Sequence, residues 1–118
     1  MGLTREARVR HAVAVYLAIA DDGVELLEPD KVNDLYASYW QRLGSDTIAR
    51  VLAEHDAGEL LPDMNHVMIP VATLRRLAEG RVGDDWETRF AGMLDVARER
   101  GWLDESGTAV RAHLERER

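Results

Sequence analysis

The stretch from Arg5 to Ala20 reads REARVRHAVAVYLAIA and ends in an apolar run. Thr4 precedes it as a candidate N-cap, and Gly23 follows it. Its apolar residues share one face at helical spacing: Val9, Val13, Tyr16, Leu17 and Ala20, with Val15 and Ile19 widening that face. The spacing predicts a helix over residues 5–20 that has neighbours on several sides, or that lies in a subunit interface.

A second helix is expected over residues 31–43, KVNDLYASYWQRL. Asp30 can cap its start, and Gly44 ends it. The apolar positions follow the i, i+3, i+4, i+7 and i+11 pattern: Val32, Leu35, Tyr36, Tyr39 and Leu43.

Three more helices are predicted from their start and stop signals, over residues 46–57, 70–79 and 85–100. The last has the clearest pattern, with Asp84 and Glu87 as an acidic capping box and Gly101 after its end. The tail, residues 102–118, is expected to be a helix beginning near Thr108. The alternative is a hairpin turning at Ser106-Gly107, with Trp102-Leu103 and Val110 on its strands.

The expected fold class is therefore all-α, a compact array of five or six short helices in a single domain over residues 1–118, with a small C-terminal β-hairpin as the main alternative. The 118-residue length fits one domain.

Composition narrows the function classes. The net charge of −7 disfavours binding to nucleic acid and to anionic membranes, and the chain has no cysteine for a disulfide or a thiolate site. Arg5, Arg8 and Arg10 before an apolar stretch resemble a signal peptide, but Glu6 and the shortness of the stretch argue against cleavage. We expect a cytoplasmic protein with no membrane partner.

No motif points to catalysis or to a cofactor. The chain has no G-x-S-x-G, H-E-x-x-H or G-x-x-x-x-G-K pattern. The densest group of metal-binding side chains comprises Glu54, His55, Asp56, Glu59, Asp63 and His66. A charged helix end followed by a solvated loop explains this group as well, so the sequence favours a non-enzymatic protein without metal or cofactor.

Two further features of the sequence support alternative functions. Three of the seven aromatic residues lie close together in the sequence: Tyr36, Tyr39 and Trp40. They suit either the core side of a helix or a pocket for a flat ligand, as in a binding or catalytic subunit. Arg75, Arg76 and Arg81 are the best candidates for phosphate contacts, which would fit a transcription regulator.

The segment from Gly58 to Pro70 motivates the leading hypothesis. It is long for a connection between helices and rich in apolar residues. Exposed apolar segments meet other chains, and methionine suits adaptable interfaces. The sequence thus predicts a self-associating interaction or accessory protein, a homodimer, which binds its partner through the first helix and through Met64, His66, Met68 and Ile69.

Overall fold

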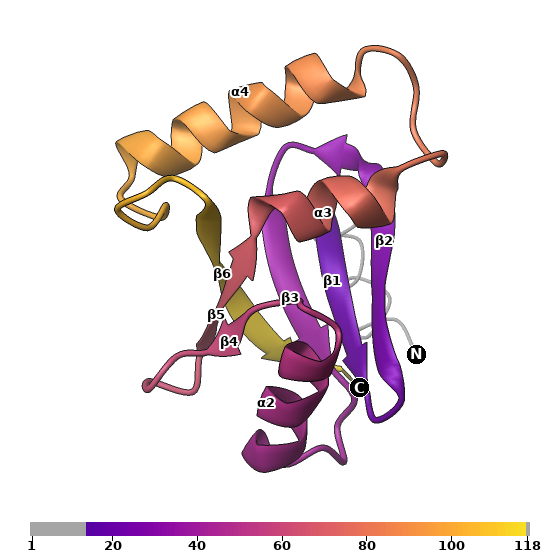
Figure 1. Cartoon of the computed structure of the whole chain (residues 1–118), viewed down its shortest axis with the longest axis vertical. Coiled ribbons are helices and arrows are strands. Elements are labelled where there is room, and N and C mark those ends of the chain that lie inside the picture. Colours follow the sequence, from indigo (N-terminus) through magenta and orange to yellow (C-terminus); the bar gives the residue numbers. More distant parts are fainter. Residues whose placement is uncertain (1–13, 118) are drawn as a thin grey trace, which may run out of the picture.

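The computed structural model describes residues 14–117, which form a mixed α/β fold (Figure 1). A six-stranded sheet with strand order β2-β1-β3-β6-β5-β4 replaces the expected all-α array. The strands are β1 (Ala14–Ala20), β2 (Gly23–Val32), β3 (Leu35–Tyr39), β4 (Glu59–Leu60), β5 (His66–Pro70) and β6 (Ala109–Arg116). The helices are α2 (Ser45–Glu54), α3 (Val71–Ala78) and α4 (Trp86–Glu99).

The centre of the sheet is built from strands that are distant in sequence. β1 forms an antiparallel hairpin with β2 and pairs in parallel with β3. β6 returns from the end of the chain to lie parallel to β3 and antiparallel to β5. The order therefore brings the last strand between two earlier ones, and residues throughout the chain contribute to one sheet.

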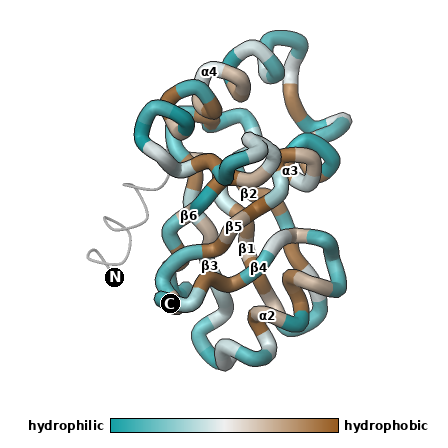
Figure 2. The backbone as a smooth tube through the Cα atoms, turned by 60° about the vertical axis from the view of Figure 1, so that its left-hand side comes forward, coloured by the Kyte–Doolittle hydropathy of each residue, from teal (hydrophilic) through white to brown (hydrophobic). Residues whose placement is uncertain are grey.

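Helices α2 and α3 lie over one face of this sheet, and α4 crosses the ends of the strands near the end of β2 (Figure 1). That face is lined by alternate strand residues, such as Leu17, Ala37 and Ile69, whose exposure is near zero. The helices add their own buried side chains, including Leu52, Leu74 and Phe90. Figure 2 shows hydrophobic residues along the central strands and the facing side of α2. Burial of this apolar surface is the main force that holds the two layers together.

Side-chain hydrogen bonds to the backbone of β2 fix α4 and the end of α3 against that edge. The Trp86 indole donates to the Pro29 carbonyl at 2.6 Å, and the Arg89 guanidinium donates to the Asp30 carbonyl at 2.7 Å. The Arg81 guanidinium donates to the Leu26 carbonyl at 2.7 Å. These donors satisfy carbonyls along the outer strand of the sheet.

The prediction of a helix over residues 5–20 is wrong for residues 14–20, which form β1; residues 5–13 lie outside the described part of the chain. Nearly every residue of this run is apolar, so it fits helical spacing and strand alternation equally well. In β1, Leu17 and Ile19 are buried on the helix-covered side, whereas Tyr16, Ala18 and Ala20 are half-buried on the other side of the sheet. Pairing with β2 and β3 decides in favour of the strand.

The helix predicted over residues 31–43 is also wrong, because these residues form the end of β2 and all of β3. Tyr36, Ser38 and Trp40 lie on one side of β3, while Leu35, Ala37 and Tyr39 face the helices. The tail is a strand, β6, rather than the expected helix. An isolated bridge between Leu103 and Val110 matches the hairpin alternative.

The helices predicted over residues 46–57, 70–79 and 85–100 are confirmed as α2, α3 and α4 within a few residues at each end. None of the helices described here is long and apolar enough to cross a membrane.

Candidate interaction face

The second face of the sheet carries the candidate site. No helix or strand of residues 14–117 covers it, and Figure 1 shows α2 and α3 in front of the opposite side. We call it the open face. From β2 to β5 it comprises Glu25, Leu27, Tyr16, Ala18, Ala20, Tyr36, Ser38, Trp40, Arg111, His113, Glu115, His66 and Met68.

A row of side chains crosses the open face at right angles to the strands. Leu27 is paired with Tyr16, Tyr16 with Tyr36, Tyr36 with His113, and His113 with His66. The Tyr16 and Tyr36 rings are stacked with centroids 4.7 Å apart, and the two imidazoles meet edge to face at 5.5 Å. Cross-strand aromatic pairs of this kind contribute to sheet stability and fix the register.

Asp63 orients one end of this row. Its carboxylate lies 2.7 Å from Nδ1 of His66 and accepts a hydrogen bond from the Asn65 amide. The Asn65 hydrogen bond, together with the one to His66, lowers the pKa of Asp63 below its ordinary value. In such a pair, the carboxylate can orient the histidine so that it acts as a general base. The adjoining depression of about 240 Å³ is lined by Tyr36, Trp102, Arg111 and His113, among others, but by no serine or lysine.

A larger hollow of about 740 Å³ lies at the other end of the open face. Its shape follows from the sequence of β1, because the small side chains of Ala18 and Ala20 leave space beside the larger ring of Tyr16. Trp40, 54% exposed, lines it as well. Three acidic residues also line it: Asp22, Glu25 and Glu117.

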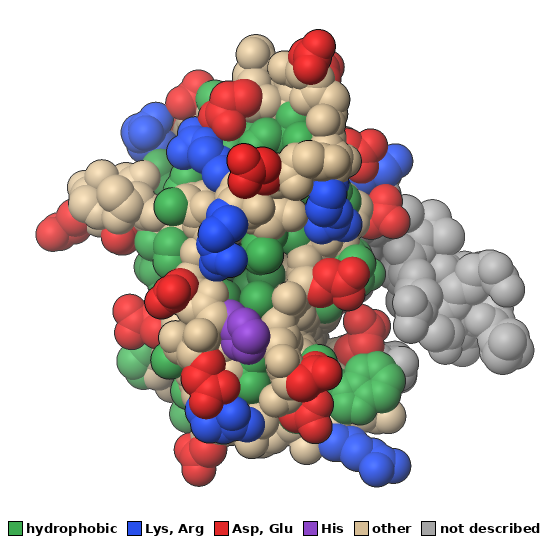
Figure 3. Space-filling model, turned by 45° about the vertical axis from the view of Figure 1, so that its right-hand side comes forward, with side chains coloured by type: hydrophobic (Ala, Val, Ile, Leu, Met, Phe, Trp, Pro, Cys, Tyr) green, Lys and Arg blue, Asp and Glu red, His purple; other side chains and the backbone are tan. Residues whose placement is uncertain are grey.

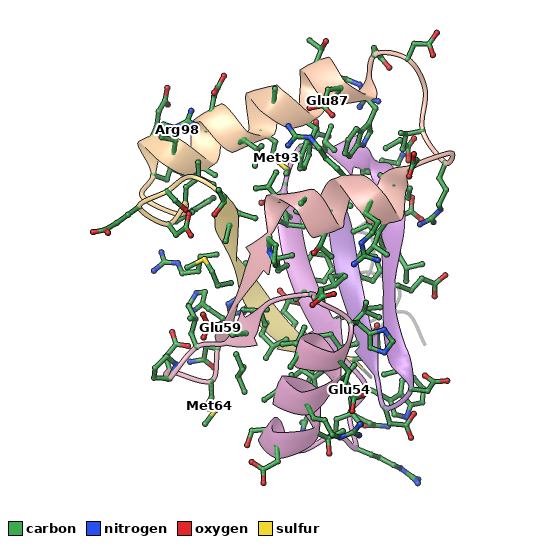
Figure 4. All side chains as sticks on the ribbon, in the orientation of Figure 1. Glu54, Glu59, Met64, Glu87, Met93 and Arg98 are labelled. Carbon is green, nitrogen blue, oxygen red and sulfur yellow. The ribbon has the colours of Figure 1, made fainter. Side chains whose placement is uncertain are left out.

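The predicted partner-binding residues are divided between surface and core. His66 and Met68 lie on the open face, and Met64 stands 56% exposed in the β4–β5 turn (Figure 4). Ile69 has no exposed surface and packs in the core. The strand alternation causes this split, because neighbouring residues point to opposite faces.

The predicted aromatic cluster is divided in the same way. Tyr36 and Trp40 lie on the open face, whereas Tyr39 packs against the core from the other side. The sequence interpretation missed Tyr16, Ala18, Ser38, Arg111 and His113. Polar and apolar residues alternate in 111–115 (RAHLE), and this period of two could have identified Arg111 and His113; the runs 14–20 and 36–40 carry no such alternation.

The arginines considered for phosphate contacts have internal partners. Arg75 forms a bidentate pair with Glu87 at 2.7–3.1 Å, Arg76 donates to the His55 carbonyl, and Arg81 binds the β2 backbone. On the side shown in Figure 3, basic and acidic side chains are interspersed. Neither observation supports a phosphate-binding surface.

The metal-binding side chains considered above are also separated. His66 contacts Asp63 on the open face, while His55 follows the end of α2 and lies beside Gly23. Within residues 14–117, no three histidine or acidic side chains are placed to hold a metal ion together.

Comparison of the chain with family models, with curated proteins and with solved structures gives no match.

Proposed function

We propose that this protein is a non-enzymatic interaction protein that acts in the cytoplasm and self-associates through the open face of its sheet. The supporting observation is the asymmetry of the two faces. Helices cover one, while the other presents Trp40, Met68 and Leu27 without a covering element among the described residues. The exposed Trp40 and the partly buried Leu27 and Met68 lie among polar side chains, a mixture typical of protein–protein contacts, in which aromatic residues and methionine are enriched.

The edges of the sheet are poorly suited to association by strand addition. Along the outer strand β2, Glu28 adopts φ 50° and is followed by Pro29, which has no amide hydrogen to donate. At the other edge, β4 is only two residues long. Both features interrupt the row of backbone groups that a further strand would need, and this leaves the open face as the better surface.

The size of the open face suggests a reversible contact. Five strands at a spacing of about 4.8 Å give a width of roughly 24 Å, and six residues at about 3.3 Å give a length of roughly 20 Å. A footprint on the order of 480 Å² per copy lies at the low end for specific interfaces. We therefore expect a dimer that dissociates on dilution.

The test is the molar mass of the native chain in solution, measured by light scattering over a concentration series. Trp40→Ser and Met68→Ser should each weaken the dimer while the far-UV circular dichroism spectrum stays native. Val96→Ser is the matched control, because Val96 is 45% exposed but lies on α4. A monomer at every concentration, or an equal effect of Val96→Ser, would contradict the proposal.

A further inference from the structure

The hollow on the open face has the chemistry of a receptor for a cationic side chain. Asp22 and Glu25 line it, and neither carboxylate forms an ion pair with the residues that the structure describes. The exposed ring of Trp40 offers an aromatic surface. A guanidinium group suits both, since it pairs with carboxylates and stacks on aromatic rings.

Ser38 adds a hydroxyl group to the lining of the hollow. Its side chain lines the hollow although the residue is only 4% exposed. Its hydroxyl forms no hydrogen bond within residues 14–117. The register aligns Glu25, Ala18 and Ser38 across three adjacent strands, with the small Ala18 side chain in the middle. A donor placed over Ala18 would therefore lie between the carboxylate and the hydroxyl.

Arg111 is a cation of the right kind elsewhere on the same face. It is exposed on β6 opposite Met68, and its guanidinium forms no ion pair or hydrogen bond within the described residues. It cannot fill the hollow of its own chain. Ser38 is paired with Glu115, so Arg111 lies four residues, or about 13 Å, farther along the strand and about 10 Å across from β1.

A second copy of the chain removes this separation. When two copies stack open face to open face about a two-fold axis that lies between the hollow and Arg111, each hollow receives the arginine of the other copy. Such isologous contacts always form in pairs. Because each chain carries a net charge of −7, local complementarity of this kind is also needed to offset repulsion between the copies.

We infer that the dimer interlocks through Arg111, which enters the hollow formed by Asp22, Glu25, Ser38 and Trp40 of the second copy. This inference rests on the proposed self-association and specifies its register. Arg111 and Glu25 are exposed and make no side-chain contact that the described fold needs, so their charges can be reversed without removing an internal ion pair.

The experiment is a charge exchange between two variants of the full chain, followed by native mass spectrometry. Arg111→Glu alone and Glu25→Arg alone should each weaken self-association at least about tenfold, the scale expected for a lost interfacial ion pair. Mixing the two variants should restore a dimer that contains one copy of each. At one site the native pair of Arg111 and Glu25 is kept, and at the other site the two substituted side chains form a pair of opposite charge.

Arg116→Glu is the matched control. Arg116 lies on the same strand and is exposed, but its register with Tyr39 places it on the helix-covered side. This variant should dimerise like the native chain. If Arg111→Glu dimerises equally well, or if the mixture stays monomeric, the interlocking is wrong while the Trp40→Ser and Met68→Ser results still decide the proposed function. A native chain that is monomeric and carries an extra small-molecule mass would overturn both.

Discussion

At the scale of single residues, backbone conformation restricts a few positions more strongly than burial does. Gly58 has φ 113°, and a Cβ built there would lie 1.9 Å from the Met68 carbonyl oxygen. This close approach lets the backbone turn from the end of α2 into the short β4 strand, which pairs with β5. Only glycine fits, because the conformation and the space both exclude a side chain.

Gly58→Ala should therefore lower the free energy of unfolding by about 2–5 kcal/mol, from strain and overpacking together. Gly80→Ala is the control, because Gly80 has φ 77° but nothing within 4 Å of the added Cβ. That change should cost only about 1–2 kcal/mol. Urea unfolding of the two variants measures both values, and equal losses would show that the contact with Met68 is not limiting.

At the scale of elements, the turn before β6 depends on one carboxylate. Asp104 accepts hydrogen bonds from the backbone amides of Thr108 and Ala109 at 2.9 and 3.2 Å, and from the Ser106 hydroxyl. Partial burial would raise the pKa of Asp104, but these hydrogen bonds outweigh it, so the pKa lies below the ordinary value of 3.8. The carboxylate thus holds the chain in position to enter the sheet.

This turn makes the stability of the fold sensitive to acid. A carboxyl group whose pKa is lower in the folded than in the unfolded chain stabilises the fold above pH 3.8 and loses that contribution as the pH falls through its folded pKa. Asp104→Ala should lower the melting temperature at neutral pH, and its deficit should shrink below pH 3.8. Thermal unfolding followed by circular dichroism at neutral and acidic pH tests this, and a deficit independent of pH would contradict it.

At the scale of the whole molecule, the topology places the last strand near the middle of the sheet. β6 pairs with both β3 and β5, so the two halves of the sheet meet only through the last strand. One continuous core cluster includes residues from β1 to β6. Because these contacts are distant in sequence, we expect slow, cooperative folding that requires the complete sheet.

A chain that ends at Gly107 should accordingly fail to fold, because β3 and β5 would each lose a central neighbour. A chain that ends at Glu117, with β6 intact, should unfold like the full-length protein. Amide dispersion in proton–nitrogen NMR spectra distinguishes the two results. A well-dispersed spectrum from the shorter chain would show that the remaining sheet is stable without β6.

Some features of this protein follow from its sequence alone. Capping residues and glycine stops identify α2, α3 and α4, because helix ends have local chemical requirements. The signals around residues 58–70 and 36–40 also pointed to segments that contribute to the open face. Local sequence does not show that Ile69 and Tyr39 face the core, because the side of a strand that is buried depends on its pairing with β6 and on the helices packed against the sheet.

Only the tertiary structure decided the rest. The run from Ala14 to Ala20 is apolar at almost every position, so its local preference is nearly balanced between helix and strand. Its partners in β2 and β3 settle the choice, since backbone pairing and burial on the helix-covered face both favour the strand. The same long-range pairing places Tyr16, Tyr36 and His113 in one row, although nothing in their local sequence connects them.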